Sequence, residues 1–353
     1  MSPDVHAFAN RGRQRDDLPM PTAFVSTPDC RVRLVSERLQ IHGKGESGTF
    51  CVLREIPIRD LDRLIAIEGT QISGEALAAL LRAEIPIAFL GWNGRYLGAF
   101  QPTTPAHGAW RLRQYQAALD PAFCLAVAGR IVAAKIYNQR RVVQRLAANR
   151  SDDVSRDLAY LDALLSEAYR SEAIETLRGY EGAAAARYFS TWASFLPESF
   201  PFERRSTRPP LNAVNACISF GATLLYHETV SAIHARGLDP ALGMLHTTED
   251  GRWSLALNLM EPFRPVLVEA LSLDVFTHQI LNEKHFRPHE GGVYLNDEGR
   301  AKFIVQYERR MERQFMSEFA GHRTTLRHQI DDSVARFKSS LEKPSDFEAF
   351  VMN

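Results

Sequence analysis

Short apolar runs of the kind found in β-strands dominate the first hundred residues. Arg31–Val35 alternates polar and apolar side chains, which is typical of a strand with one buried face. Ile85–Leu90 is almost entirely apolar and predicts a buried strand. The Asn-Gly pair at 93–94 then predicts a hairpin turn, with Tyr96–Phe100 as the returning strand. This part of the chain is therefore predicted to be β-rich.

Beyond a Pro-containing linker at 101–108, the apolar period changes to that of helices. The predicted helices cover 121–149, 153–168, 171–190, 213–236, 255–260 and beyond, and 299–316, after one earlier helix at 74–83. We therefore predict an α+β protein of two domains. It would comprise a flexible arm at 1–20, a small β-rich N-terminal domain at 21–108, a larger all-α C-terminal domain at 109–330 and a tail at 331–353.

The composition excludes several classes of protein. The chain has 353 residues and is 45% hydrophobic, with 42 Lys+Arg against 42 Asp+Glu, which is typical of a globular protein rather than a disordered one. Its four cysteines show no Cys-x-x-Cys spacing, which argues against a zinc ribbon or a disulfide scaffold. The N-terminus lacks the apolar core of a signal peptide, and no apolar run approaches the ~20 residues of a membrane span. We expect a cytoplasmic protein without a membrane segment.

The zero net charge conceals an uneven distribution of arginine. Only six of the 42 basic residues are lysine, which leaves 36 arginines, and the arginine fork suits bidentate contacts with phosphate. A genomic bias would give the same count. Between Trp110 and Arg150, eight basic residues face a single acid, so this segment carries +7. It is either a solvated basic face or the footprint of a nucleic-acid backbone.

Three segments combine polar side chains with apolar helical sequence and could perform chemistry. Glu181 stands among glycine and alanine residues. It is either a carboxylate closely surrounded by a neighbouring helix, which would need a partner, or an acid in the first turn of a helix that the helix dipole stabilises. His246 follows an apolar run, and Asn258 and Glu261 are spaced i, i+3, hence on one helical face. An imidazole and two carboxylates are a reasonable donor set for Mn²⁺ or Mg²⁺. No phosphate-binding glycine loop, dinucleotide fingerprint or nucleophile elbow is present in the sequence.

Several motifs in fixed order resemble one family. They are Ala134-Lys-Ile-x-Asn-Gln139, Leu177-Arg-Gly-x-Glu-Gly with Ala-Arg187-Tyr-Phe, Phe202-Glu-Arg-Arg-x-x-Arg208-Pro-Pro, Gly237-Leu-Asp-Pro240 with Leu-His246, and Ser254-Leu-Ala-Leu-x-Leu-Met-Glu261-x-Phe-Arg-Pro265. Together they resemble the CRISPR-associated protein one family, the metal-dependent endonuclease and integrase of spacer acquisition. The resemblance spans roughly Thr27 to Arg310.

The resemblance implies a β-rich N-terminal domain used in dimerisation and a helical catalytic domain. It implies that Glu181, His246 and Glu261 are the catalytic residues and bind Mg²⁺ or Mn²⁺. It also implies a homodimer that joins a dimer of CRISPR-associated protein two in a heterohexamer. That assembly would hold a double-stranded DNA prespacer with single-stranded 3′ ends and join those ends to CRISPR repeat DNA by transesterification.

Three arginines in these motifs are predicted DNA contacts. Arg178 lies three residues before Glu181, on the same side of a helix, and is predicted to touch a phosphate. Arg187 and Arg208 are the other two. The alternative for Arg178 is a surface arginine whose stem covers apolar atoms.

The main departure from the family pattern is Asn258, where the family commonly has Asp. An amide removes one negative charge, so we place Asn258 beside the metal ligands rather than among them. Two alternatives to the integrase stay open. One is a catalytically weakened DNA-binding or scaffolding homologue, and the other is an arginine-rich helical nucleic-acid-binding module without an active site.

Overall fold

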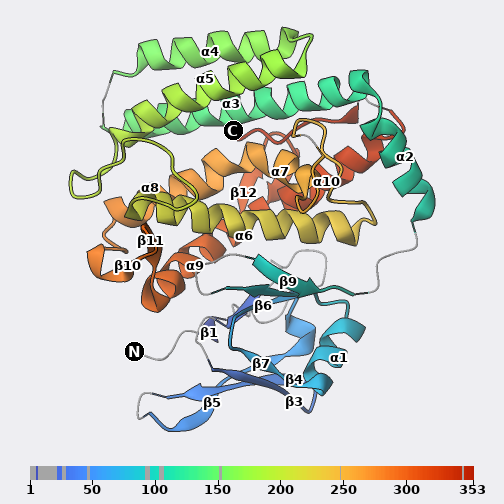
Figure 1. The fold of residues 1–353 in the computed structure, drawn as a ribbon, viewed down its shortest axis with the longest axis vertical. Helices are drawn as coiled ribbons and strands as arrows, with labels where there is room; N and C mark the ends of the chain where they lie inside the picture. The colour runs from blue at the N-terminus through green and yellow to red at the C-terminus, as the bar shows by residue number, and fades with distance from the viewer. Residues whose placement is uncertain are drawn as a thin grey trace.

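The structure is a computed structural model that describes residues 5–6, 22–25, 29–45, 48–91, 96–102, 107–150, 153–246, 248–343 and 346–353. Figure 1 shows strands at one end of the molecule and helices at the other, which confirms the predicted α+β fold class. Of the predicted arm, only Val5 and His6 are described, and they form strand β1.

In the part that the structure describes, the N-terminal region contains two sheets and one α-helix. A five-stranded sheet has the order β1-β2-β6-β8-β9, and a four-stranded sheet has the order β5-β4-β3-β7. The elements are β1 Val5–His6, β2 Thr22–Val25, β3 Arg31–Val35, β4 Arg38–Lys44, β5 Phe50–Pro57, the 3-10 turn η1 Ile58–Asp60, β6 Arg63–Ile67, β7 Gln71–Ile72, α1 Gly74–Arg82, β8 Ile87–Leu90 and β9 Tyr96–Phe100. Strands β8 and β9 pair antiparallel as predicted, whereas the turn at 93–94 lies outside the described residues.

The central strands of the five-stranded sheet are apolar on both faces because each face has its own core. Along β6, Leu64 and Ala66 pack into the core of the N-terminal region, while Ile65 and Ile67 pack into the core of the helical region. Successive side chains of a strand point to opposite faces, so one strand serves both cores. The sheet is therefore the shared wall between the two regions.

The rest of the chain is mainly helical, as predicted. Its elements are α2 Gly108–Ala118, α3 Pro121–Arg150, α4 Ser155–Arg170, α5 Ile174–Ala193, α6 Ala213–Ala235, α7 Ser254–Met260, the 3-10 turn η2 Glu261–Phe263, the π-helical segment η3 Arg264–Glu269, α8 Ala270–Thr277, η4 Glu283–His285, β10 Phe286–His289, β11 Gly292–Leu295, α9 Asp297–Glu312, β12 Phe315–Ser317, β13 His322–Thr324 and α10 Leu326–Ser340. Two short antiparallel hairpins, β10–β11 and β12–β13, interrupt the predicted all-α region.

The predicted tail is part of the folded structure. Its proposed start at 331 falls inside α10, and Phe347 and Phe350 near the end of the chain are each 1% exposed. The division at 330 is therefore not a break in the packing. No single helix in the described ranges is long and apolar enough to cross a membrane. One pair of consecutive helices, 108–118 and 121–148, has sufficient length and apolar composition when taken together, but the pair is bent by 90°.

A buried ionic cluster joins the two regions. Arg63 on β6 contacts Glu228 on α6, and Arg327 on α10 lies 3.2 Å from the same carboxylate and 2.9 Å from Glu308. Nearby, the ring of Tyr96 stacks on the ring of His227 with centroids 3.9 Å apart. Since an unpaired buried charge is costly, these contacts favour one relative placement of sheet and helices.

Candidate active site

The two predicted catalytic carboxylates come together around an ammonium group. Lys135 Nζ on α3 lies 2.6 Å from Glu181 Oε1 on α5 and 2.5 Å from Glu261 Oε2 at the start of η2. The side chains of Lys135, Glu181 and Glu261 are 8%, 17% and 5% exposed. Three separate helices thus bring two acids to one cation in a mostly buried position.

Glu261 lies where a regular helix becomes irregular. It ends α7 and begins the 3-10 turn η2, which is followed by the π-helical segment η3. Pro262 and Pro265 have no backbone N–H and remove the i→i−4 bonds that a regular helix needs there. Such irregular helical turns frequently occur at functional sites, and here the irregularity directs the Glu261 side chain toward α3 and α5.

The electrostatics of this cluster favour charged side chains. Burial alone would raise the pKa of Glu261, but Arg264 and Lys135 outweigh it and hold that pKa at about 2. Burial acts to lower the pKa of Lys135, yet Glu261 and Glu181 raise it above its ordinary value. Arg264 lies 2.9 Å from Glu261 Oε1 on the other side. Glu261 is therefore an ionised carboxylate held between two cations.

His246 lies in electrostatic range of both carboxylates, but its contact is with Asn258. Burial lowers the pKa of His246, and the charges of Glu261 and Glu181 oppose that shift. Asn258 Oδ1 accepts hydrogen bonds from the backbone N–H groups of Met244 and Leu245, at 2.6 and 3.0 Å. The amide nitrogen of Asn258 then faces His246 Nδ1 at 2.5 Å. Asn258, itself fully buried, thus fixes both the loop before His246 and the imidazole.

The loop that carries His246 needs a glycine and an arginine. A Cβ on Gly243 would collide with the backbone oxygen of His246 and with Ser254 of α7, so only glycine permits this close approach. Arg178 on α5 donates two hydrogen bonds to the Leu245 carbonyl, at 3.1 and 2.6 Å. Arg178 is therefore beside the site as predicted, but in this structure it holds the loop in place.

The other two predicted DNA-contacting arginines lie in different surroundings. Arg187 is ion-paired with Asp157 of α4 at 2.5 Å and its guanidinium lies over the Tyr160 ring. Arg208 is exposed and lines a groove that begins at Glu261. Arg208 thus remains available to a ligand in this groove, while Arg187 has a structural role between α4 and α5.

The basic residues of 110–150 are mostly engaged within the protein. Arg113 pairs with Glu342 and Arg140 with Asp162, while Arg141 and Arg145 donate to the backbone oxygen of Asn353. These four arginines are therefore tied to other parts of the protein and do not form a free solvated face. Two of the contacts are ion pairs with acids that are distant in the sequence, and the other two end on a backbone oxygen.

The groove beside Glu261 has a volume of about 960 Å³ and follows α6. Its lining combines cationic and aromatic side chains with three carboxylates: Tyr96, Arg205, Arg208, Tyr226, His227, Glu249, Asp250, Arg252, Trp253, Glu261 and Arg264. The Tyr226 and Trp253 rings are stacked with centroids 6.1 Å apart. Flat rings beside arginines suit a single-stranded nucleic acid, whose bases stack and whose phosphates need cations.

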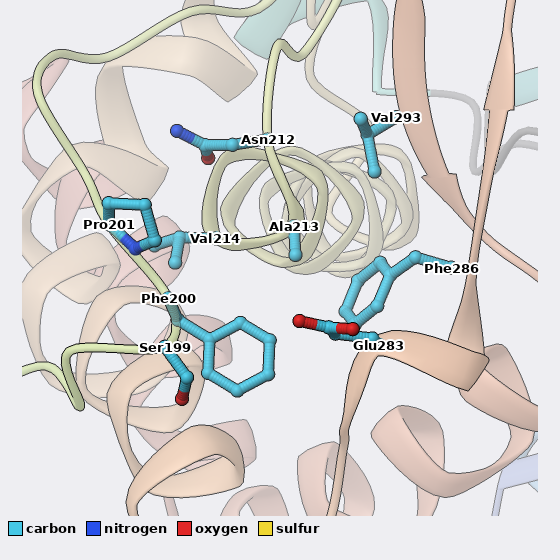
Figure 2. Close-up of a pocket in the computed structure, with 9 residues that line it drawn as sticks. All are labelled: Ser199, Phe200, Pro201, Asn212, Ala213, Val214, Glu283, Phe286 and Val293. Atoms are coloured by element: carbon cyan, nitrogen blue, oxygen red, sulfur yellow. The ribbon is translucent and has the colours of Figure 1, made fainter.

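A second, smaller pocket lies apart from these residues. Figure 2 shows Phe200, Glu283 and Phe286 gathered around Ala213 in the first turn of α6, in a cavity of about 250 Å³. Asn212 caps that helix by accepting from Asn215 N–H at 2.8 Å. None of the predicted catalytic or DNA-contacting residues lines this pocket.

Sequence reasoning did not assign a role to Lys135, Asn138, Arg205 or Arg264. All four stand in the motifs that carried the family resemblance, so the motifs contained the signal. Their roles depend on contacts between helices that are distant in the sequence. Among the residues that the structure describes, no three His, Cys, Asp or Glu side chains are arranged closely enough to hold a metal ion, because Lys135 lies between the carboxylates and Asn258 faces the imidazole.

Known proteins resemble the chain over most of its length. It is 33% identical over 304 residues to the CRISPR-associated endonuclease Cas1 1 of Thermodesulfovibrio yellowstonii, covering 84% of this chain and 92% of that relative. It is 36% identical over 300 residues to a Cas4/Cas1 fusion of Geobacter sulfurreducens, covering 82% of this chain but 53% of the fusion.

Two solved structures share the fold. A Cas1 protein from Thermotoga maritima superposes with a TM-score of 0.74 at 26% identity, covering 94% of this chain and 99% of that one. A casposase bound to integration product gives a TM-score of 0.81 at 22% identity, covering 94% and 92%. The family described as CRISPR associated protein Cas1 matches residues 23–309, which confirms the resemblance seen in the motifs: the chain belongs to the Cas1 family.

Proposed function

We propose that this chain is the metal-dependent DNA endonuclease and integrase of CRISPR spacer acquisition. It would join the 3′-hydroxyl ends of a prespacer to CRISPR repeat DNA by transesterification. Relatives at 32–33% identity are named CRISPR-associated endonucleases, and a structural neighbour with the same fold is a casposase bound to integration product. These names support the reaction class.

The observation that carries the proposal is the cation held between Glu181 and Glu261 beside the groove. The Lys135 ammonium group shows that these two carboxylates accommodate a positive charge from opposite sides. Carboxylate oxygens are the donors that Mg²⁺ and Mn²⁺ prefer, and the imidazole of His246, whose pKa the charges of both carboxylates raise against the effect of burial, is a nitrogen donor of the type these ions accept. The donor types therefore suit such an ion, with Glu181, His246 and Glu261 as the ligands once Lys135 Nζ leaves the space between the two carboxylates and the three side chains draw closer together.

Strand joining exchanges one phosphodiester for another, so the same number of P–O bonds forms and breaks. A bound Mg²⁺ or Mn²⁺ would neutralise the charge that develops on the phosphate and orient the attacking and leaving oxygens. The chain itself supplies the DNA grip: Arg205 and Arg208 along the groove would contact phosphates, and Trp253 and Tyr226 would stack with bases. Arg178 would keep the His246 loop in place during the reaction.

We further propose that the chain acts as a homodimer that joins a dimer of CRISPR-associated protein two in a heterohexamer. Structural neighbours include the Cas1 part of a complex named Cas6-RT-Cas1–Cas2. The substrates would be a double-stranded prespacer with single-stranded 3′ ends and the CRISPR repeat. Size measurement of the mixed proteins by light scattering, with and without DNA, tests this assembly.

The reaction is tested by half-site integration of a labelled prespacer into a supercoiled plasmid carrying the repeat, with Mn²⁺ and the partner protein. We expect joined product from the parent chain and none from Glu181→Gln, His246→Ala or Glu261→Gln. Glu175→Gln is the matched control, because Glu175 is an exposed acid on the same helix α5. DNA binding without joining by the parent chain would contradict the proposal.

The structure offers one argument for a second candidate, a catalytically weakened DNA-binding or scaffolding homologue. Asn258 replaces the Asp that the family commonly has and presents its amide nitrogen to His246 Nδ1. A weakened protein would bind prespacer DNA normally and join it slowly even at saturating Mn²⁺. The same integration assay separates this candidate from the first.

A further inference from the structure

The last residues of the chain pack directly behind the site. Residues 346–353, named here the C-terminal segment, follow α10 and lie outside the residues 23–309 matched by the family. Figure 1 shows the C-terminus close to α3 and α7, the helices that carry Lys135 and lead into Glu261. Phe347, Phe350 and Met352 in this segment are buried. The segment thus forms part of the wall of the site.

One buried side chain connects the C-terminal segment to the Glu261 turn. Asn138 lies three residues after Lys135 on α3 and is fully buried. Its Nδ2 donates to the Pro262 carbonyl at 2.7 Å and to the Phe350 carbonyl at 3.0 Å, and its Oδ1 accepts from Met352 N–H at 2.8 Å. Asn138 therefore binds η2 and the C-terminal segment at once.

A pair of aromatic rings makes the second connection. Phe350 and Phe263 stack with centroids 4.5 Å apart and ring planes 4° apart, and each residue is 1% exposed. Phe263 is two residues after Glu261 in the 3-10 turn, where Pro262 prevents a regular helical bond. The turn thus depends on contacts from outside its own helix to fix its orientation.

The C-terminal segment is itself anchored at both ends. Arg130 donates to the Phe347 carbonyl at 2.6 Å, and Arg145 donates to the backbone oxygen of Asn353 at 2.7 Å. The Asn353 side chain accepts from Glu318 N–H at 3.0 Å. Because the C-terminal segment is held at both ends, the position of Phe350 between them is fixed.

We propose that the C-terminal segment is a positioning element of the active site. Phe350, acting through Phe263 and together with Asn138, holds Glu261 in the orientation in which it faces Glu181 across the cation position. This inference rests on the proposed metal-dependent function. Phe350 touches neither DNA nor metal, so it is a positioning residue and not a catalytic one.

Phe350→Ala and Phe347→Ala form a matched pair for the test. Both remove a buried phenyl ring from the same segment, but the Phe347 ring packs edge-to-face on Phe337 of α10, 6.1 Å away, and not on Phe263. For each variant, urea unfolding gives the stability, electron paramagnetic resonance gives the Mn²⁺ dissociation constant, and strand joining gives kcat and KM for DNA.

We expect Phe350→Ala to weaken Mn²⁺ binding by about 10–100-fold, the range found when a supporting partner of a metal ligand is lost. It should lower kcat and leave KM for DNA unchanged. Phe350→Leu, which keeps apolar volume at the position, should recover part of the Mn²⁺ affinity. Phe347→Ala should lose stability and retain parental Mn²⁺ affinity.

Equal Mn²⁺ affinities in Phe350→Ala and Phe347→Ala would overturn the inference. If Phe350→Ala does not fold, the comparison of Phe350→Leu with Phe347→Ala decides in the same way. A parent chain that binds Mn²⁺ but joins no DNA would refute the proposed function, while the Mn²⁺ affinities of the variants would still decide the positioning role. A parent chain that binds no Mn²⁺ would refute both.

Discussion

Asn258→Asp should strengthen metal binding, and the reason lies in the hydrogen bonds of its amide. The Asn258 oxygen is committed to the backbone N–H groups of Met244 and Leu245, so the NH₂ group faces His246 Nδ1. An NH₂ group donates, so Nδ1 must present its lone pair, and the neutral imidazole then carries its proton on Nε2. A protonated nitrogen cannot bind a metal.

An aspartate at this position reverses the arrangement. One carboxylate oxygen would accept from the same two backbone N–H groups, and the other would accept from His246 Nδ1–H, which leaves Nε2 free to bind. Such a carboxylate–histidine pair changes metal affinity by about 10–100-fold, or about 1.4–2.7 kcal/mol. We therefore expect Asn258→Asp to lower the Mn²⁺ dissociation constant by that factor and to raise the rate of strand joining at limiting Mn²⁺.

Two measurements check this reasoning independently. Mn²⁺ titration followed by electron paramagnetic resonance gives the affinity, and ¹⁵N shifts of labelled histidine show which ring nitrogen of His246 carries the proton. Asn296→Asp, at the N-cap of α9, controls for the added negative charge. A parent protein with the proton already on Nδ1, or an unchanged Mn²⁺ affinity in Asn258→Asp, would refute the reasoning.

Three further predictions concern stability. Lys135→Met in EDTA should lower the free energy of unfolding by about 3–5 kcal/mol, because it leaves two carboxylates close together without their buried cation. Excess Mn²⁺ should restore part of this free energy, as measured by urea unfolding. The control Lys343→Met, at an exposed lysine, should lower the free energy of unfolding by at most about 1 kcal/mol in either condition. Burial lowers the pKa of His227 to about 3. Below pH 6.5 the unfolded chain therefore binds a proton at His227 that the folded chain does not bind, so the folded state loses stability as the pH falls from 6.5 toward 3. Between pH 7 and pH 5 this loss is about 2 kcal/mol, and urea unfolding of His227→Phe at the two pH values should lack it. Arg63→Met should destabilise the protein by about 3 kcal/mol, since it leaves the buried carboxylate of Glu228 with one cation fewer. Adding Glu228→Gln should recover part of that loss. Simple additivity of the two substitutions would contradict an energetic coupling between Arg63 and Glu228.

Local patterns predicted most of the secondary structure, and they failed where long-range contacts decide. The alternation in Arg31–Val35 and the Asn-Gly pair at 93–94 depend on near neighbours, and the strands β3, β8 and β9 occur as predicted. The strands of β10–β11 are only four residues long, and three of the four residues of β10 are exposed. No periodicity can emerge from so few positions.

The candidate site shows the same limit. Glu181, His246 and Glu261 were predicted from motifs, because the type of each side chain can be read locally. The position of Lys135 between two of them and the role of Arg178 follow only from the packing of α3, α5 and α7. In the same way, the net charge of 110–150 did not reveal its partners, since Asp162 comes from α4 and Glu342 from the turn after α10.

The strand β6 has a consequence for how the protein can be divided. Ile65 and Ile67 belong to the helical core, while Leu64 and Ala66 on the same strand belong to the other core. An N-terminal fragment that ends at the linker near 108 would expose Ile65 and Ile67 to water and would therefore be prone to aggregation. The two regions should therefore melt in one cooperative transition, and a soluble fragment of either would require its exposed apolar wall to be redesigned.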